Sequence, residues 1–154
     1  MVQRTWLITG VSSGFGREMA QQLLASGERV IGTVRSTAKV EDLLAAWPET
    51  FSAPLLDVTD GAAVRQVVDE AWARFGRIDV VIANAGYGLF GAAEELSDAQ
   101  VQQMIDTNLL GSIQLIRSAL PHLRAQGGGR VIQISSYGGQ VAFAGNSMYH
   151  ATKW

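Results

Sequence analysis

The sequence predicts an α/β fold whose core is a parallel, doubly wound sheet with the strand order 3-2-1-4-5. Short apolar segments alternate with amphipathic helical segments along the chain. Parallel strands need helical crossovers of this kind. A glycine-rich turn also joins the first apolar segment to the first helical segment, which is how a βαβ unit begins.

The N-terminal half alternates between predicted strands and helices. We expect strands over residues 5–9, 29–34 and 51–57, separated by helices over residues 15–26 and 40–47. The apolar face of the first helix consists of Met19, Ala20, Leu23 and Leu24, and Gly27 closes this helix. Pro48 ends the second helix. Pro54 interrupts the third strand, which therefore belongs at the edge of the sheet.

The next helix and strand carry clear signals in their side chains. Thr59 or Asp60 caps a helix that continues to Phe75 and ends at Gly76. Its inward-facing residues are expected to be Val64, Val67, Val68 and Ala71. The strand over residues 79–83 is continuously apolar, which is typical of a strand buried on both faces.

The C-terminal part is expected to contain a long helix, a fifth strand and a last helix. Ser97 and Gln100 have the spacing of a capping box, and the helix continues with a bend to about residue 125. Pro121 is expected to kink this helix or to end its regular hydrogen bonding. The fifth strand covers residues 130–135, and Ser147 is expected to cap the last helix.

Length and composition bound the class of protein. The 154 residues fit a single domain, residues 1–154. Hydrophobic residues make up 47% and charged residues 17%, which indicates a well-buried globular chain. The net charge is -2 without a basic run, so we expect no nucleic-acid partner.

The chain has no cysteine, and we expect no metal site. Trp6 to Ile8 is too short an apolar stretch for a signal segment or a membrane span, which predicts a cytoplasmic protein without a membrane partner.

The glycine-rich turn predicts a site for a dinucleotide. Gly10, Gly14 and Gly16 let the backbone turn sharply out of the first strand and approach a pyrophosphate closely, while helix N–H groups point at it. Ser12, Ser13 and Phe15 belong to the same predicted contact surface. The alternative is a tight strand-to-helix turn that binds nothing.

The residues after the second and third strands indicate which dinucleotide would bind. A fold that prefers NAD places an acid near the end of the second strand, whereas this chain has Arg35 there. An arginine accommodates a 2′-phosphate with charge-assisted hydrogen bonds, so we expect NADP rather than NAD. Asp57 and Val58, after the third strand, are expected beside the adenine. Alternatively, Arg35 is an ordinary surface residue and Asp57 only caps the following helix.

Two further motifs lie where the same site is expected. Asn84, Ala85 and Gly86 follow the fourth strand and can form a tight turn beside the cofactor. Tyr149 and Lys153 stand at positions i and i+4 and share one helix face. A lysine close to a phenol favours the phenolate, and such a tyrosine can give a proton to a carbonyl or take one from an alcohol. His150 is expected to be a packing or surface residue outside this scheme.

Taken in order along the whole chain, these residues resemble the classical short-chain dehydrogenase/reductase (SDR) family. The resemblance implies a Rossmann-like fold and an oxidoreductase that acts on a small alcohol or carbonyl compound. It implies that Ser136 orients the substrate carbonyl, that Tyr149 is the general acid/base, and that Lys153 holds the nicotinamide ribose and favours the tyrosinate. By the same resemblance, Asn108 supports a water that leads protons away.

The chain also departs from the family pattern, because members normally continue well beyond the lysine with further strands and a substrate-covering segment. We therefore expect the N-terminal portion of such a fold, without its last strands. Apolar surface between residues 109 and 123 is then expected to be exposed, and a homo-oligomer is predicted. The alternative function is a non-catalytic, truncated dinucleotide-binding module.

Overall fold

The computed structural model describes residues 2–154 and contains the parallel sheet that the sequence predicts. The strand order is β3-β2-β1-β4-β5, and every pairing is parallel. The strands are β1 (Thr5–Thr9), β2 (Arg29–Thr33), β3 (Phe51–Ser52), β4 (Val80–Ala83) and β5 (Arg130–Gln133). The helices are α1 (Gly14–Ala25), α2 (Glu41–Ala46), α3 (Gly61–Phe75), α4 (Asp98–Ile105), α5 (Gly111–Ala125) and α6 (Ser147–Lys153). Short helical turns η1 to η4 cover Thr37–Lys39, Ala93–Glu95, Asp106–Leu110 and Tyr137–Gly139.

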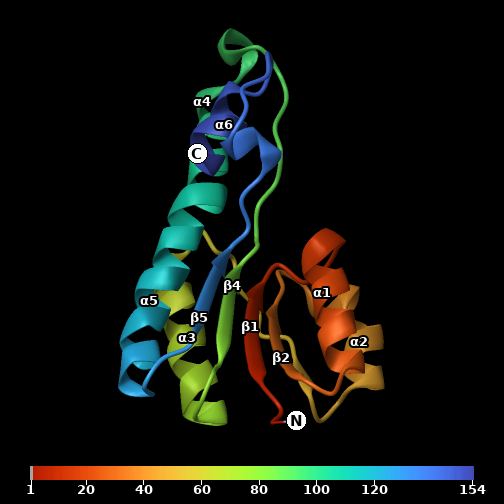
Figure 1. The fold of residues 1–154 in the computed structure, drawn as a ribbon. Helices are drawn as coiled ribbons and strands as arrows, with labels where there is room; N and C mark the ends of the chain where they lie inside the picture. Colours follow the sequence, from red (N-terminus) through yellow and green to blue (C-terminus); the bar gives the residue numbers. More distant parts are fainter. Residues whose placement is uncertain (1) are drawn as a thin grey trace.

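Helices cover both faces of the sheet, α1 and α2 on one side and α3 and α5 on the other (Figure 1). Successive residues of β1 point to opposite faces, so Leu7 and Ile8 enter two different cores. Leu7 packs with residues of α3 and α5, such as Val64 and Leu115. Ile8 packs with residues of α1, such as Ala20. The central strands are therefore buried on both faces, which confirms the prediction for β4.

Local capping explains where the main helices begin and end. Asp60 caps α3, because its carboxylate accepts hydrogen bonds from Ala62 N and Ala63 N at 2.9 and 3.0 Å. Gly76 ends this helix with a φ of 69°, a conformation that favours glycine. The predicted capping box is present at Ser97 and Gln100.

Several predicted boundaries were wrong for identifiable reasons. β3 has two residues and is followed by a single bridge between Val34 and Leu55, because Pro54 has no N–H to donate. β5 ends at Gln133, although Ile134 N still donates to Ala83 O at 3.0 Å, and the Ser135 hydroxyl donates to Lys153 O of α6. The N-cap of α6 is Asn146, so Ser147 is the first helical residue and not the cap. The end of α5 at Ala125, by contrast, was predicted correctly, and the helix continues past Pro121, whose missing N–H removes one hydrogen bond.

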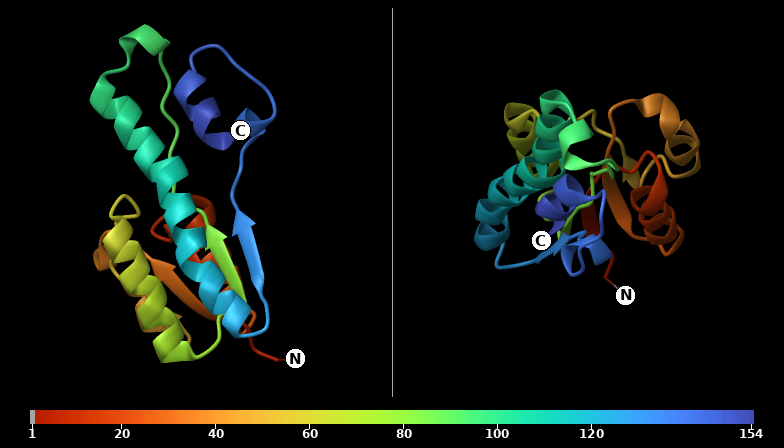
Figure 2. Two further views of the ribbon diagram at one scale, coloured as in Figure 1. Left: turned by 90° about the vertical axis from the view of Figure 1, so that its left-hand side faces the viewer. Right: turned by 90° about the horizontal axis from the view of Figure 1, so that it is seen from above.

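The long helix is interrupted earlier than Pro121, by a π-helical turn at Asp106–Leu110 between α4 and α5. Turns of this kind occur often at functional sites. The helix extends beyond the carboxyl ends of the strands, where α6 packs beside α4 and the π-helical turn (Figure 2).

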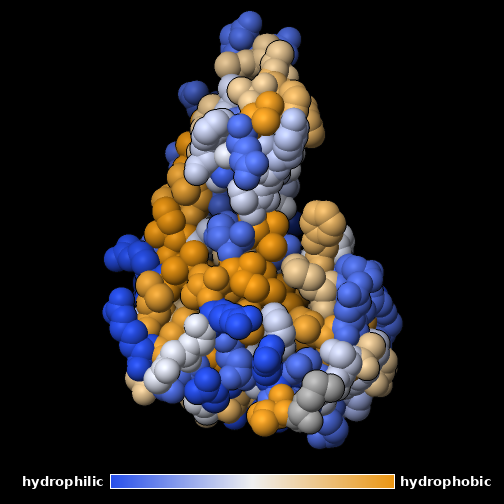
Figure 3. Space-filling view, viewed as in Figure 1, coloured by the Kyte–Doolittle hydropathy of each residue, from blue (hydrophilic) through white to orange (hydrophobic). Residues whose placement is uncertain are grey.

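Apolar side chains gather on the face that carries β5 and along α5 (Figure 3). The exposed large apolar residues in this part of the chain are Leu109 and Leu110 in the π-helical turn, Ile113 in α5, and Val131 and Ile132 in β5. Within residues 2–154, no helix has the length and apolar character needed to cross a bilayer.

Candidate active site

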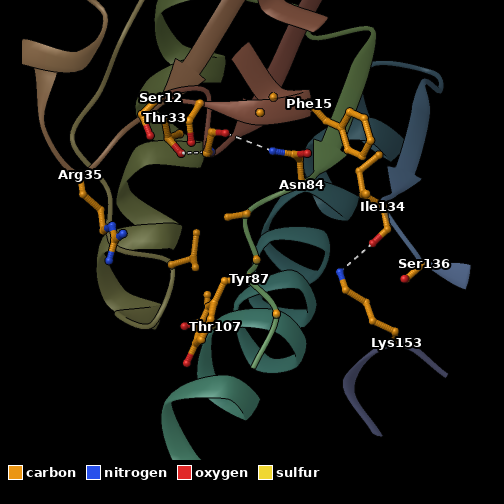
Figure 4. Close-up of a pocket in the computed structure, with 18 of the residues that line it drawn as sticks. Ser12, Phe15, Thr33, Arg35, Asn84, Tyr87, Thr107, Ile134, Ser136 and Lys153 are labelled. Atoms are coloured by element: carbon orange, nitrogen blue, oxygen red, sulfur yellow. Dashed lines mark hydrogen bonds between the residues drawn. The ribbon is translucent and has the colours of Figure 1, made fainter. Parts of the chain in front are cut away.

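A cavity of about 880 Å³ lies at the carboxyl ends of the parallel strands. In open α/β sheets this edge is where ligands bind. Turns after all five strands contribute to its wall, as does α6. Figure 4 shows Arg35 and Lys153 on opposite sides of this space, with the glycine turn between them. Predicted site residues that line it are Gly10, Ser12, Ser13, Gly14, Phe15, Gly16, Arg35, Asp57, Val58, Asn84, Ala85, Gly86, Ser136, Tyr149 and Lys153.

The glycine turn is held in shape by Asn84 and Thr9. Asn84 Nδ2 donates to Thr9 O at 2.9 Å and to Gly10 O at 3.1 Å. Thr9 Oγ1 accepts from Asn84 N and Ala85 N, both at 3.1 Å. A Cβ atom at Gly16 would lie 2.2 Å from Gly10 O, so no side chain fits there. The ends of β1 and β4 are thereby fixed to each other at the floor of the cavity.

The start of α1 fits an anionic group. The first N–H groups of a helix have no intrahelical acceptor. Ser13, the N-cap of α1, makes no side-chain capping bond, and the first turn carries no acidic residue. Gly14 has a φ of 56°, and a Cβ there would meet no atom within 4 Å. These amides border the cavity, so the chain offers the donors and the positive end of a helix dipole that a diphosphate requires.

Arg35 and Asp57 form the polar end of the cavity beyond the glycine turn. Asp57 Oδ1 accepts from Thr59 N at 3.0 Å and from Thr59 Oγ1 at 2.8 Å. These hydrogen bonds, with a smaller contribution from the positive charge of Arg35, hold the pKa of Asp57 below its ordinary value. Asp57 therefore stabilises the turn that precedes α3 and also borders the cavity. Val58 is buried behind it, where a Cβ on Gly111 would lie 2.9 Å from Val58 Cγ2.

Tyr149 and Lys153 lie at the other end of the cavity, on α6. Lys153 Nζ donates to Ile134 O at 3.1 Å and lies 5.9 Å from the centroid of the Tyr149 ring. Burial lowers the pKa of the Lys153 ammonium, because a low-polarity environment disfavours its charge. A negative charge nearby would offset that cost, so the amine and the phenol are suited to act as a pair.

The two adjacent serines before η4 have different hydrogen bonds. Ser135 Oγ donates to Lys153 O at 3.2 Å. Ser136 Oγ accepts from Gly138 N at 3.1 Å. The Ser135 hydroxyl hydrogen is thus used in a hydrogen bond to the backbone of α6, whereas the Ser136 hydroxyl can still donate its hydrogen to a ligand in the cavity.

Asn108 is the one predicted site residue that does not line the cavity among those the structure describes. It is 1% exposed and lies in the π-helical turn. Its Oδ1 accepts from Tyr87 N at 3.0 Å, and its Nδ2 donates to Tyr87 O at 2.8 Å and to Thr152 Oγ1 at 3.2 Å. Thr152 Oγ1 in turn donates to Tyr149 O at 2.8 Å. Asn108 therefore ties the turn after β4 to the helix that carries Tyr149.

Some lining residues were not predicted as site residues from the sequence. They are Thr33, Val34, Leu56, Gly88, Gln103, Thr107, Ile134, Ser135 and Tyr137. Tyr137 directly follows Ser136, so its position next to that residue could have indicated it. Gln103 and Thr107 come from the long helix, and no local motif marks them.

Comparison with known proteins agrees with this geometry. The family model described as short chain dehydrogenase matches residues 4–154. The chain belongs to the short-chain dehydrogenase family. Oxidoreductase BOA17 of Botryotinia fuckeliana is 38% identical over 152 residues, which are 98% of this chain and 56% of that protein. The chain thus spans only a little more than half of this relative.

Two solved structures superpose closely on this chain. A short-chain dehydrogenase from Streptomyces avermitilis superposes with a TM-score of 0.95 and 45% identity, over 99% of this chain and 56% of that one. ElxO, solved with NADP bound, superposes with a TM-score of 0.92 and 31% identity, over 99% of this chain and 63% of that one. A site for a nicotinamide dinucleotide at the carboxyl ends of the strands therefore agrees with both the family and the cavity.

Proposed function

We propose that the protein is an NADP-dependent oxidoreductase that interconverts an alcohol and a carbonyl compound, with Tyr149 as the general acid/base. The observation that carries the proposal is one continuous cavity that joins an uncapped helix N-terminus and Arg35 at one end to Ser136, Tyr149 and Lys153 at the other. That order of groups suits a long dinucleotide whose reactive ring lies beside a proton donor.

Different residues along the cavity would bind different parts of the dinucleotide. The amides of residues 12 to 15 would hold the diphosphate, and Asp57 and Val58 would border the adenine. Arg35 would contact the 2′-phosphate that distinguishes NADP from NAD, since a guanidinium gives charge-assisted hydrogen bonds to phosphate. The structure of ElxO with bound NADP supports this choice of cofactor by likeness of fold.

The chemistry at the other end needs a hydride and a proton. When bound, the nicotinamide supplies or accepts the hydride. In the direction of reduction, the Ser136 hydroxyl would donate a hydrogen bond to the carbonyl oxygen, and the Tyr149 phenol would transfer its proton to that oxygen as the alcohol forms. The Lys153 ammonium would favour the resulting phenolate, which regains its proton from solvent.

Cofactor choice is tested by fluorescence titration with NADPH and, in parallel, with NADH. We expect NADPH to bind the unmodified protein more tightly, and we expect Arg35→Gln to weaken NADPH at least tenfold while it changes NADH less than twofold. Arg124→Gln is the matched control, because Arg124 is an exposed arginine in the last turn of α5. Equal weakening of both cofactors in Arg35→Gln, or no binding of either, would contradict the assignment.

The reaction is tested by NADPH oxidation with a panel of alkyl and aryl ketones and aldehydes. Tyr149→Phe is expected to abolish turnover and to leave the affinity for NADPH within about twofold, because it removes only the transferable proton. Tyr137→Phe is the control, since Tyr137 lines the same cavity without an assigned proton transfer. Tight NADPH binding without turnover of any compound would favour a binding module that does no chemistry.

A further inference from the structure

His150 follows Tyr149 on α6, and its side chain is 7% exposed. The ring makes two hydrogen bonds to the segment that leaves β5. His150 Nδ1 lies 2.6 Å from Gly138 O, and His150 Nε2 accepts from Phe143 N at 2.9 Å. The ring therefore does more than pack against its neighbours, because it bridges Gly138 O and Phe143 N, which lie five residues apart in the chain.

The two contacts determine the tautomer of the ring. A backbone N–H can only donate, so Nε2 must offer its lone pair to Phe143 N. The ring hydrogen is then on Nδ1, which donates to Gly138 O, and His150 is neutral. Both ring nitrogens are thus satisfied inside the protein, as a buried polar group requires.

The contact with Gly138 continues to a predicted catalytic group. Gly138 N donates to Ser136 Oγ at 3.1 Å, while Gly138 O accepts from His150. One peptide segment therefore connects the ring of His150 with the hydroxyl of Ser136. A Cβ atom at Gly138 would lie 2.8 Å from His150 Nδ1 and 3.2 Å from Tyr149 Cε1, so the close approach requires glycine.

The contact with Phe143 holds the other end of the same segment. The Phe143 ring lies 5.8 Å from the His150 ring and 5.4 Å from the Tyr137 ring, measured between centroids. Tyr137 lines the cavity next to Ser136. His150 thereby holds an aromatic wall as well as the serine.

From these contacts we propose that His150 is a positioning residue, which sets Ser136 against Tyr149 through Gly138 and holds the Tyr137–Phe143 wall through Phe143 N. The proposal rests on the proposed function for the roles of Ser136 and Tyr149. Nδ1 makes the contact with Gly138 and Nε2 makes the contact with Phe143, so substitutions can remove one contact and keep the other.

The substitutions differ in which bond they keep. His150→Asn places an amide N–H near the position of Nδ1 and can keep the bond to Gly138 O, but it removes the acceptor for Phe143 N. His150→Phe keeps a ring and removes both bonds. We expect His150→Asn to raise KM at least fivefold with kcat within about threefold, and His150→Phe to lower kcat at least tenfold. Both variants should bind NADPH within about twofold of the unmodified protein.

Two readouts test the contacts without turnover. Nitrogen-15 NMR of the unmodified protein should show a neutral His150 ring with its hydrogen on Nδ1. Amide hydrogen exchange at Phe143 should accelerate at least tenfold in both variants. His122→Asn is the matched control, because His122 is the other histidine and lies on α5, where it contacts Asp69.

Each outcome supports or overturns the positioning role of His150. A ring hydrogen on Nε2, or exchange at Phe143 that His150→Phe leaves unchanged, would overturn the proposal even if no substrate is found. If His150→Phe does not fold, the NMR tautomer and the exchange of Phe143 in His150→Asn still decide. If Tyr149→Phe loses turnover while kcat and KM of both His150 variants stay unchanged, the proposed function stands. His150 then has no part in it. Retained turnover in Tyr149→Phe would instead overturn the proposed function, and the tautomer and exchange data would still report on His150.

Discussion

Ser135 and Ser136 are neighbours in the chain, but one hydroxyl donates a hydrogen bond within the protein and the other accepts one. The Ser135 hydroxyl donates to the backbone of α6, whereas the Ser136 hydroxyl accepts from Gly138 N and keeps its hydrogen for a ligand. In the sequence, only the family resemblance favoured Ser136. The hydrogen bonds supply an independent physical reason for the same choice.

Ser136→Ala is therefore expected to lower kcat about 100-fold, the usual cost of removing a donor to a developing oxyanion. Ser135→Ala removes a bond to the backbone instead, and its kcat is expected to stay within about threefold. Steady-state rates of NADPH oxidation would measure both values, with NADPH affinity as a check on folding. A larger loss of kcat in Ser135→Ala would reverse the assignment.

At the scale of elements, predictions succeeded where side-chain pattern decides the backbone. β1, β2 and β4 were confirmed because apolar runs next to turn residues leave few alternatives. The π-helical turn was not predicted, because an extra residue in a helix leaves no local pattern. His150 was expected to be a packing or surface residue, and it is buried. Its two backbone contacts depend on how the segment after β5 folds back, which no spacing reveals.

The beginning of β1 is joined to the loop before β4 by Asp79. Its carboxylate accepts from Thr5 N at 2.9 Å and from Arg77 Nε at 2.7 Å. Burial alone would raise the pKa of Asp79, but these hydrogen bonds and the nearby positive charges outweigh it, and the pKa lies below its ordinary value. The stabilisation is therefore complete above the ordinary carboxyl pKa and is lost as the pH falls through the lowered folded value.

Asp79→Asn should lower the free energy of unfolding by about 1 kcal/mol near neutral pH, since the amide presents an N–H to one of the two donors. The difference from the unmodified protein should shrink as the pH falls below about 4. Urea unfolding between about pH 3 and pH 7 would measure it. Glu94→Gln, at an exposed acid in η2, should show no such difference. A difference that grows in acid would contradict the sign.

At the scale of the whole molecule, most predicted site residues border one cavity because they follow strands, and the carboxyl ends of parallel strands meet at one edge. The fold class thus brought these motifs together, whereas Tyr149 and Lys153 reach the cavity from α6. The exposed apolar surface was also expected between residues 109 and 123, and it is present at Leu109, Leu110 and Ile113, which are 38%, 41% and 39% exposed. Leu115 and Leu123 are buried instead, because they face the sheet.

This exposed helix face leads to the prediction of a homo-oligomer. Sedimentation velocity should show mass that rises with protein concentration, and Ile113→Glu should shift the distribution toward monomer, because a charge there would be buried without a partner. Val2→Glu, at a residue that is 90% exposed and distant in sequence, should not shift it. A monomer at every concentration would refute the prediction.

The π-helical turn at Asp106–Leu110 has a geometric consequence for the chain as a whole. Each residue of a regular α-helix turns the chain by about 100°, whereas a π-helical turn holds one more residue than an α-helical turn. The wide turn therefore takes up the extra residue, and Met104 on α4 and Leu115 on α5 are both buried. Deleting one residue within the turn is expected to restore regular winding with both faces kept, whereas inserting a residue within α5 would rotate everything after it and expose the apolar face.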